Sequence, residues 1–198
     1  MVARRPSIAK SAVATGRGDD GTTGLLFGGR IAKDDPLTEA YGTVDEAVAS
    51  LGGARVSLAA AGLSELADLV LRYQRELFVV GAELATNPTA RDRLKDGVTR
   101  VSEEMLDRVE SDLARWESEV VMPREFVVPG ETAASTALEV ARTVLRRAER
   151  RIIGVVSAGN LRSEWLVPYV NRLADLIWVL ARAAEQAEHA SPTAARVR

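Results

Sequence analysis

With 198 residues, 46% of them hydrophobic and 27% charged, the chain has the size and balance of one globular domain with a buried core. Its formal net charge of −2 argues against general nucleic-acid binding, which needs a basic surface. The absence of cysteine excludes disulfides, thiolate metal sites and a cysteine nucleophile and fits the cytoplasm, and no apolar run approaches the roughly 18 residues of a membrane span.

The N-terminal part predicts a leader followed by a glycine-rich loop. Residues 1–13 are basic with small side chains and lack the apolar core of a secretory signal, so we expect a flexible leader. Residues 14–30 read ATGRGDDGTTGLLFGGR and show neither a helical nor a strand period. Their G-x-G-x-x-G spacing does not predict a dinucleotide fold, because no strand precedes it. Composition alone favours a flexible linker over a loop whose glycine amides and threonine hydroxyls wrap a polyphosphate, and both interpretations stay open.

Five later segments carry the apolar periodicity of helices, and Asp35 with Pro36 marks the first start as an N-cap followed by proline. The apolar positions are, in chain order, Tyr41, Val44, Val48, Leu51 and Leu58; Leu66, Val70, Tyr73, Leu77, Val80 and Leu84; Val101, Met105, Val109 and Leu113; Ala137, Ala141, Val144, Ala148, Ile152 and Val155; and Leu166, Val170, Leu173, Ile177 and Leu180. We therefore predict an all-α antiparallel five-helix bundle with a glycine-rich N-terminal loop. Residues 14–187 form the domain, and residues 188–198 are expected to be a flexible tail.

The connection EVVMPREFVVPGET, residues 119–132, contains two prolines and cannot be helical throughout. With its valines, methionine and Phe126, this connection is unusually apolar for a surface loop, so we expect another surface to pack against it. The run Phe-Val-Val at 126–128 is the only weak candidate for a strand.

Polar side chains on three of the predicted helices are candidate site residues. In ARTVLRRAERR, residues 141–151, Arg142, Arg146 and Glu149 share one helix face. A solvated charged face and a carboxylate- or phosphate-binding face explain this run about equally well. Asn171 lies inside an apolar helix, where it serves either a core hydrogen bond or a ligand. Asp45 lies beside a helix face of small residues, and we expect its carboxylate to form an ion pair with an arginine.

The single histidine narrows the possible chemistry. His189 is the single histidine and lies near the C-terminus, so paired Glu-x-x-His motifs for a di-iron centre are absent and the sequence does not indicate a Ser-His-Asp triad.

Four blocks of the sequence carry a resemblance to a known family. RGDDGTTGLLFGGRIAKDDP, EAYGTVDE, FVVPGETAASTALEVARTVLRRAER and YVNRLADLIWVLAR together resemble the PduO-type ATP:corrinoid adenosyltransferases, from about Thr15 to Arg182. Members of that family transfer the 5′-deoxyadenosyl group of ATP to the cobalt of reduced corrinoid. The main alternative is a non-catalytic helical-bundle module that binds a nucleotide or regulates a partner.

The resemblance implies a homotrimer with active sites between subunits, where the glycine-rich loop covers the ATP triphosphate and Mg²⁺ is held through ATP without direct protein ligands. Its implied ATP-binding residues are Thr15, Gly18, Asp19, Gly21, Thr22, Lys33, Arg146, Glu149 and Asn171. Arg142 would pair with Asp45 of the adjacent subunit, and Phe126 would lie under the corrin. The implied partners are a flavin reductase and an adenosylcobalamin-dependent enzyme. The chain departs from the family pattern before the loop, where Ala14 replaces a tyrosine and the basic residue is shifted to Arg17, and at Ala174, where a hydroxyl is lost.

Overall fold

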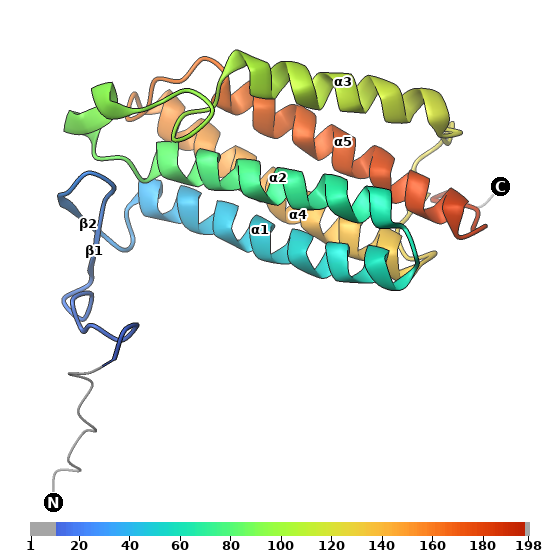
Figure 1. Cartoon of the computed structure of the whole chain (residues 1–198), viewed down its shortest axis with the longest axis horizontal. Helices are drawn as coiled ribbons and strands as arrows, with labels where there is room; N and C mark the ends of the chain where they lie inside the picture. The colour runs from blue at the N-terminus through green and yellow to red at the C-terminus, as the bar shows by residue number, and fades with distance from the viewer. Residues whose placement is uncertain (1–10, 197–198) are drawn as a thin grey trace, which may run out of the picture.

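Five long helices form the body of the protein in a computed structural model that describes residues 11–196 (Figure 1). They are α1 (Pro36–Ala60), α2 (Ser64–Leu84), α3 (Glu103–Glu119), α4 (Ala133–Ser157) and α5 (Leu166–Ala187). Each runs antiparallel to the one before it (Figure 1). The predicted all-α five-helix bundle is therefore confirmed.

Local sequence signals set two of the helix starts. Asp35 caps α1, because its Oδ1 accepts a hydrogen bond from the Leu37 amide at 2.8 Å and Pro36 occupies the first turn. Thr132 and Ser135 form a reciprocal capping box at the start of α4. The capping box ends the apolar loop and fixes where the arginine-bearing helix begins.

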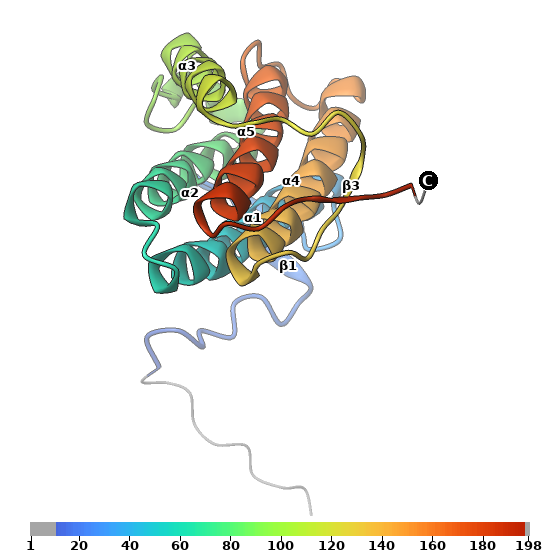
Figure 2. The same ribbon diagram turned by 90° about the vertical axis from the view of Figure 1, so that its right-hand side faces the viewer.

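Helix α5 lies at the centre of the bundle, and the end-on view shows it between α3, α2 and α4 (Figure 2). Most of its residues are buried, whereas α1 and α4 each bury one apolar stripe and pack closely against each other. Residues on α5 can therefore be reached from outside only where a cleft opens between neighbouring helices.

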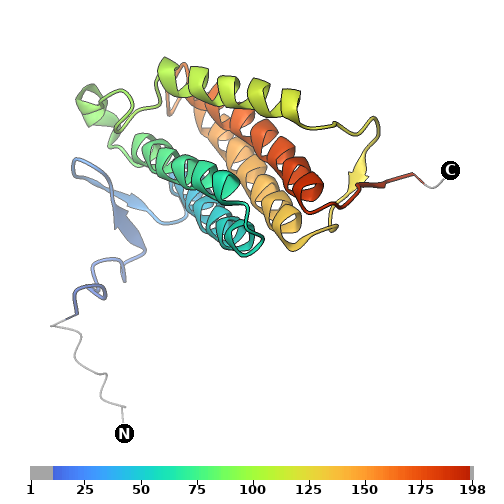
Figure 3. The same ribbon diagram turned by 45° about the vertical axis from the view of Figure 1, so that its right-hand side comes forward.

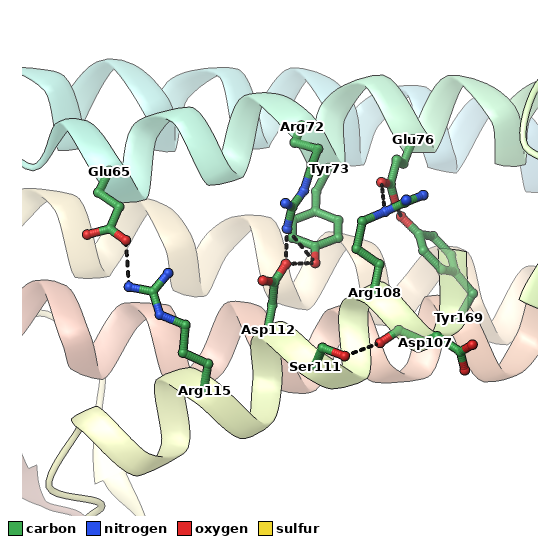
Figure 4. Close-up of polar contacts among 10 residues, drawn as sticks. All are labelled: Glu65, Arg72, Tyr73, Glu76, Asp107, Arg108, Ser111, Asp112, Arg115 and Tyr169. Carbon is green, nitrogen blue, oxygen red and sulfur yellow. Dashed lines mark hydrogen bonds and ion pairs between the residues drawn. The ribbon is translucent and has the colours of Figure 1, made fainter. Parts of the chain in front are cut away.

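Helix α3 contacts α2 mainly through long polar side chains (Figure 4). Asp112 accepts hydrogen bonds from Arg72 and from the Tyr73 hydroxyl, and Arg115 pairs with Glu65 at 2.6 Å. Further along, Glu76 accepts from Arg108 at 3.1 Å and from the Tyr169 hydroxyl of α5 at 2.8 Å. Burial raises the pKa of Tyr73 and of Tyr169, so both remain neutral donors to these carboxylates.

Three features differ from the sequence prediction in the regions around the bundle. Residues Thr22–Gly24 (β1) and Arg30–Ala32 (β2) pair as an antiparallel hairpin within the glycine-rich segment. Val101 lies before α3 instead of inside it, because its amide donates to the buried carboxylate of Glu83 at 2.8 Å. The connection between α2 and α3 also contains a short 3₁₀ helix, η1 (Pro88–Arg93), where only a polar loop was expected.

The C-terminal segment pairs with the apolar loop at 119–132. Val127–Val128 (β3), the weak strand candidate, forms an antiparallel pair with Thr193–Ala194 (β4), which lies in the segment predicted to be a flexible tail (Figure 3). The Ala195 amide also donates to the Phe126 carbonyl at 2.7 Å. Of the predicted leader, residues 1–10 lie outside the described residues.

No helix in the described part of the chain is long and apolar enough to cross a membrane.

Candidate functional site

The glycine-rich segment has a defined conformation built around Asp20. Its carboxylate accepts hydrogen bonds from the amide and the hydroxyl of Thr22, at 2.9 and 2.8 Å, and lies 3.3 Å from the Arg30 guanidinium. Arg30 also donates to the Thr22 hydroxyl at 2.7 Å and to the Arg17 carbonyl. These hydrogen bonds, chiefly those from Thr22, hold the pKa of Asp20 below its usual range. The linker interpretation that composition favoured does not describe this hairpin.

Lys33 folds back over the turn of the loop. Its amide donates to the Gly21 carbonyl at 2.9 Å, and a Cβ atom added to Gly18 would lie only 2.9 Å from the Lys33 ammonium nitrogen. Gly21 has φ of +80°, a conformation that favours glycine. Gly18, Gly21, Thr22 and Lys33 are thus neighbours, as an anion-binding loop requires. Thr15 and Asp19 are exposed on the same segment.

The tip of the loop docks on the end of α2. The Leu26 amide donates to the Ala85 carbonyl at 2.8 Å, and the Asn87 side chain donates to the Gly28 carbonyl at 2.8 Å. Arg93 of η1 stacks over the Phe27 ring at 4.2 Å. These contacts place the loop at the end of the bundle where α1 begins (Figure 1).

The arginine row of α4 is partly exposed and partly committed to ion pairs. Arg146 is exposed on the middle of the helix and has no ion pair within residues 11–196, whereas Arg147 pairs with Glu46 of α1. Arg151 pairs with Glu39 at 3.4 Å. Two of the five arginines therefore form surface ion pairs, as the interpretation of this run as a solvated charged face predicted. Arg146 remains available to a ligand.

Asn171 and Glu149 contact each other between α5 and α4. The Asn171 amide donates to Glu149 at 2.9 Å, and its oxygen accepts from Arg172 at 2.8 Å. Glu149, which the resemblance places among the ATP-binding residues, thus accepts a hydrogen bond from the side chain of another such residue. The pair is partly buried and adjoins the arginine face.

Two clefts adjoin each other along α4 and α5 and share Arg142 and Trp178. One, of about 440 Å³, is lined by the apolar loop including Phe126, Val127 and Pro129, and also by Glu139. The other, of about 310 Å³, includes Arg146 and Asp175. The Phe126 side chain is 87% exposed, so its own packing does not fix it. Because both clefts are lined by Arg142 and Trp178, the first cleft with Phe126 adjoins the second with Arg146.

Asp45 lies on a different face of the molecule. It is exposed on α1 and lines an apolar groove of about 430 Å³ with residues of α2, including Phe78, and with Leu26 of the loop. Within the chain, Arg142 pairs with Glu139 at 2.7 Å and not with Asp45. A contact between Asp45 and Arg142 thus needs a second copy of the chain.

Sequence reasoning missed the charged residues beneath Arg142. Glu139 of α4 and Arg182 and Glu185 of α5 are all buried, with Arg182 3.3 Å from Glu139 and 2.8 Å from Glu185. Burial raises the pKa of Glu185, and the positive charge of Arg182 opposes that rise. A glutamate three residues before an arginine was a visible signal for the Glu139–Arg142 pair.

No group of three or more histidine, aspartate or glutamate side chains that could hold a metal ion occurs in residues 11–196.

Comparison with known proteins identifies the family. Residues 13–184 match the family model described as cobalamin adenosyltransferase. The chain belongs to the cobalamin adenosyltransferase family. A corrinoid adenosyltransferase of Citrobacter freundii is 42% identical over 173 residues, which cover 87% of this chain and 94% of that relative. The corrinoid adenosyltransferase PduO of Salmonella typhimurium is 36% identical over 181 residues, and the match spans 90% of this chain but only 51% of that longer relative.

A solved structure extends the match to the fold. A variant of the PduO-type ATP:corrinoid adenosyltransferase from Lactobacillus reuteri, complexed with cobalamin and ATP, superposes with a TM-score of 0.82 at 28% sequence identity. The match covers 92% of this chain and 98% of that one. The resemblance predicted from four sequence blocks is confirmed for this member of the cobalamin adenosyltransferase family.

Proposed function

We propose that this chain is an ATP:corrinoid adenosyltransferase, which transfers the 5′-deoxyadenosyl group of ATP to the cobalt of a reduced corrinoid such as cob(I)alamin or cob(I)yrinic acid a,c-diamide. The observation that carries the proposal is the match of residues 13–184 to the cobalamin adenosyltransferase family. The solved relative complexed with cobalamin and ATP supports the same two substrates. The products are the adenosylated corrinoid and triphosphate.

The reaction needs neither a protein nucleophile nor a titrating base. The lone pair of Co(I) forms the bond to C5′ of ATP, the C5′–O bond breaks, and its electrons leave with triphosphate while cobalt becomes Co(III). Negative charge therefore grows on the α-phosphate oxygens. Fixed donors aimed at that charge lower the barrier most in a site that excludes water.

We assign the triphosphate to the glycine-rich loop and Arg146. Gly18, Gly21, Thr22 and Lys33 are neighbours in the loop, and Arg146 is an exposed guanidinium without an ion pair in the described chain. Thr15 and Asp19 complete the loop's contacts, and the Asn171–Glu149 pair holds the nucleotide. Mg²⁺ would be bound chiefly by the phosphates, as is usual where few carboxylates are offered, and would neutralise part of the leaving charge.

We assign the lower face of the corrin to Phe126. An apolar ring at that face excludes the water that would otherwise bind cobalt, and a four-coordinate Co(II) ion is easier to reduce to Co(I). Exposure of the ring in the isolated chain, beside the cleft that contains Arg142, supports this role.

We further propose that each active site lies between two subunits of a homotrimer. The loop docks at the end of the bundle where α1 begins, whereas the connection between α3 and α4, at residues 119–132, lies at the other end (Figures 1 and 3). Asp45 and Arg142 likewise lie on separate faces. A neighbouring chain brings a second loop and the partner's Asp45 to these residues without rearranging the bundle. We expect the protein to act in the cytoplasm with a flavin reductase and an adenosylcobalamin-dependent enzyme.

An adenosylation assay tests the proposed reaction. The protein is mixed with Mg-ATP and chemically reduced cobalamin, and the spectrum of adenosylcobalamin is followed. We expect its appearance with one triphosphate released per corrin adenosylated. A non-catalytic module would leave the cobalamin spectrum unchanged in this assay. Calorimetry with Mg-ATP then divides that alternative, because a nucleotide-binding module gives saturable heat and a purely regulatory one gives none.

A further inference from the structure

Glu139 lies directly beneath Arg142 on α4. Its Oε2 accepts a hydrogen bond from Arg142 Nε at 2.7 Å, and its Oε1 lies 3.3 Å from the Arg182 guanidinium. Only 4% of Glu139 is exposed. One buried carboxylate thus joins an arginine of the cleft to an arginine of the core.

Arg182 fixes Glu139 from below. Its side chain is fully buried, pairs also with Glu185 at 2.8 Å, and lies with its guanidinium carbon 5.7 Å from the centre of the Trp178 ring. The two carboxylates balance the charges of Arg182 and Arg142. Because a buried carboxylate is held strongly by such partners, Glu139 has little freedom to move.

The contact also determines how Arg142 is presented. A guanidinium is planar, so a hydrogen bond to Nε restricts the direction of the two terminal nitrogens. Those nitrogens donate no hydrogen bond to any residue in the range 11–196, and Arg142 lines both clefts. They remain available for a second carboxylate or for a reactant at the shared wall.

We propose that Glu139 is a positioning residue that holds Arg142 Nε and so aims its terminal nitrogens at the junction of the Phe126 and Arg146 clefts. The inference rests on the proposed function, because it assigns Glu139 to the same site. In the proposed homotrimer, these nitrogens donate hydrogen bonds to the carboxylate of the partner subunit's Asp45. Glu185 shares Arg182 with Glu139 but does not contact Arg142, so its role is confined to stability.

A matched pair of variants tests the proposal. Glu139→Leu and Glu185→Leu each remove one partner of Arg182, so both should lower the unfolding temperature by a similar amount. Glu139→Leu should also reduce kcat for adenosylation about tenfold or more and lower the fraction of four-coordinate Co(II) in the spectrum, with the Kd for Mg-ATP nearly unchanged. Glu185→Leu should keep kcat within about twofold. Equal losses of kcat in the two variants would overturn the proposal.

A double-mutant cycle with Arg142→Ala identifies the route of the effect. If Glu139 acts through Arg142, adding Glu139→Leu to Arg142→Ala should change kcat by less than about twofold. Additive losses would overturn the positioning role. If Arg142→Ala alone had normal turnover, the assignment of Arg142 in the proposed function would fail, whereas a slow Arg142→Ala beside a normal Glu139→Leu would refute only the present inference. If the leucine variants do not fold, Glu139→Gln and Glu185→Gln provide the same comparison.

Discussion

We expect the proposed transfer chemistry to depend on Arg146 more than on any other single side chain. It is exposed on α4 and has no ion pair within the described residues. Arg146→Ala should raise the activation barrier by ~2–4 kcal/mol, a loss of roughly 30- to 1000-fold in kcat/KM, because a charged donor to the leaving triphosphate is removed. Steady-state kinetics of adenosylation measure this. Arg150→Ala, an exposed arginine on the same helix, is the control and should be close to wild type.

Phe126 should affect the cobalt and not the nucleotide. Phe126→Ala should leave the calorimetric Kd for Mg-ATP unchanged but slow adenosylation that starts from Co(II), since water can then reach the lower face of the metal. Electron paramagnetic resonance with ATP bound should show five-coordinate Co(II). The matched control is Val128→Ala, which shortens a half-exposed side chain on the same loop. An unchanged four-coordinate signal in Phe126→Ala would refute the role.

At the residue scale, sequence reasoning found the exposed candidates better than their partners. Arg146 and Phe126 could be named because an arginine run and an apolar loop are visible locally. The partner of Glu149 could not be named from the sequence, because Asn171 comes from another helix and only the packing of α4 on α5 brings the two side chains together. Arg182 was missed for the same reason, since nothing local marks a buried arginine.

At the scale of elements, the polar contacts between α2 and α3 add to the packing of α3 on α5. Asp112→Asn should lower the free energy of unfolding by about 1–3 kcal/mol, because it weakens the ion pair with Arg72 and the hydrogen bond from Tyr73. Urea denaturation measures the loss. Asp107→Asn, on the same helix but without an ion pair to α2 in Figure 4, should change stability little. Equal effects of the two substitutions would show that the contacts between α2 and α3 contribute nothing specific.

The helices were predictable and the strands largely were not. Helical periodicity is a local signal, and all five helices lie where it predicted them. The Asp35–Pro36 pair is a second local signal, and it marks the start of α1. Strands of two or three residues leave too short a pattern to recognise. The β3–β4 pair, moreover, joins segments that are distant in the chain and meet only because α4 and α5 bring them to the same end of the bundle.

At the scale of the whole molecule, the proposed active site requires neighbouring chains. Asp45→Ala should weaken the homotrimer and reduce activity together, because Arg142 loses the carboxylate expected from the adjacent chain. Light scattering after size exclusion, combined with the adenosylation assay, measures both effects. Asp68→Ala removes an exposed carboxylate from α2 and provides the control. A fully active trimer after Asp45→Ala would contradict the pairing.

In the proposed trimer, adenosyl transfer occurs in a site to which one chain contributes the glycine-rich loop and its neighbour contributes Arg146. Co-expression of two differently tagged inactive chains tests it most directly, one carrying Arg146→Ala and the other Thr22→Ala with Lys33→Ala. Every mixed trimer, whichever chain it contains twice, has both elements intact at one of its three interfaces, so the purified mixed trimer should form adenosylcobalamin at about a third of the wild-type rate. A mixed oligomer as inactive as its parents would contradict the shared site.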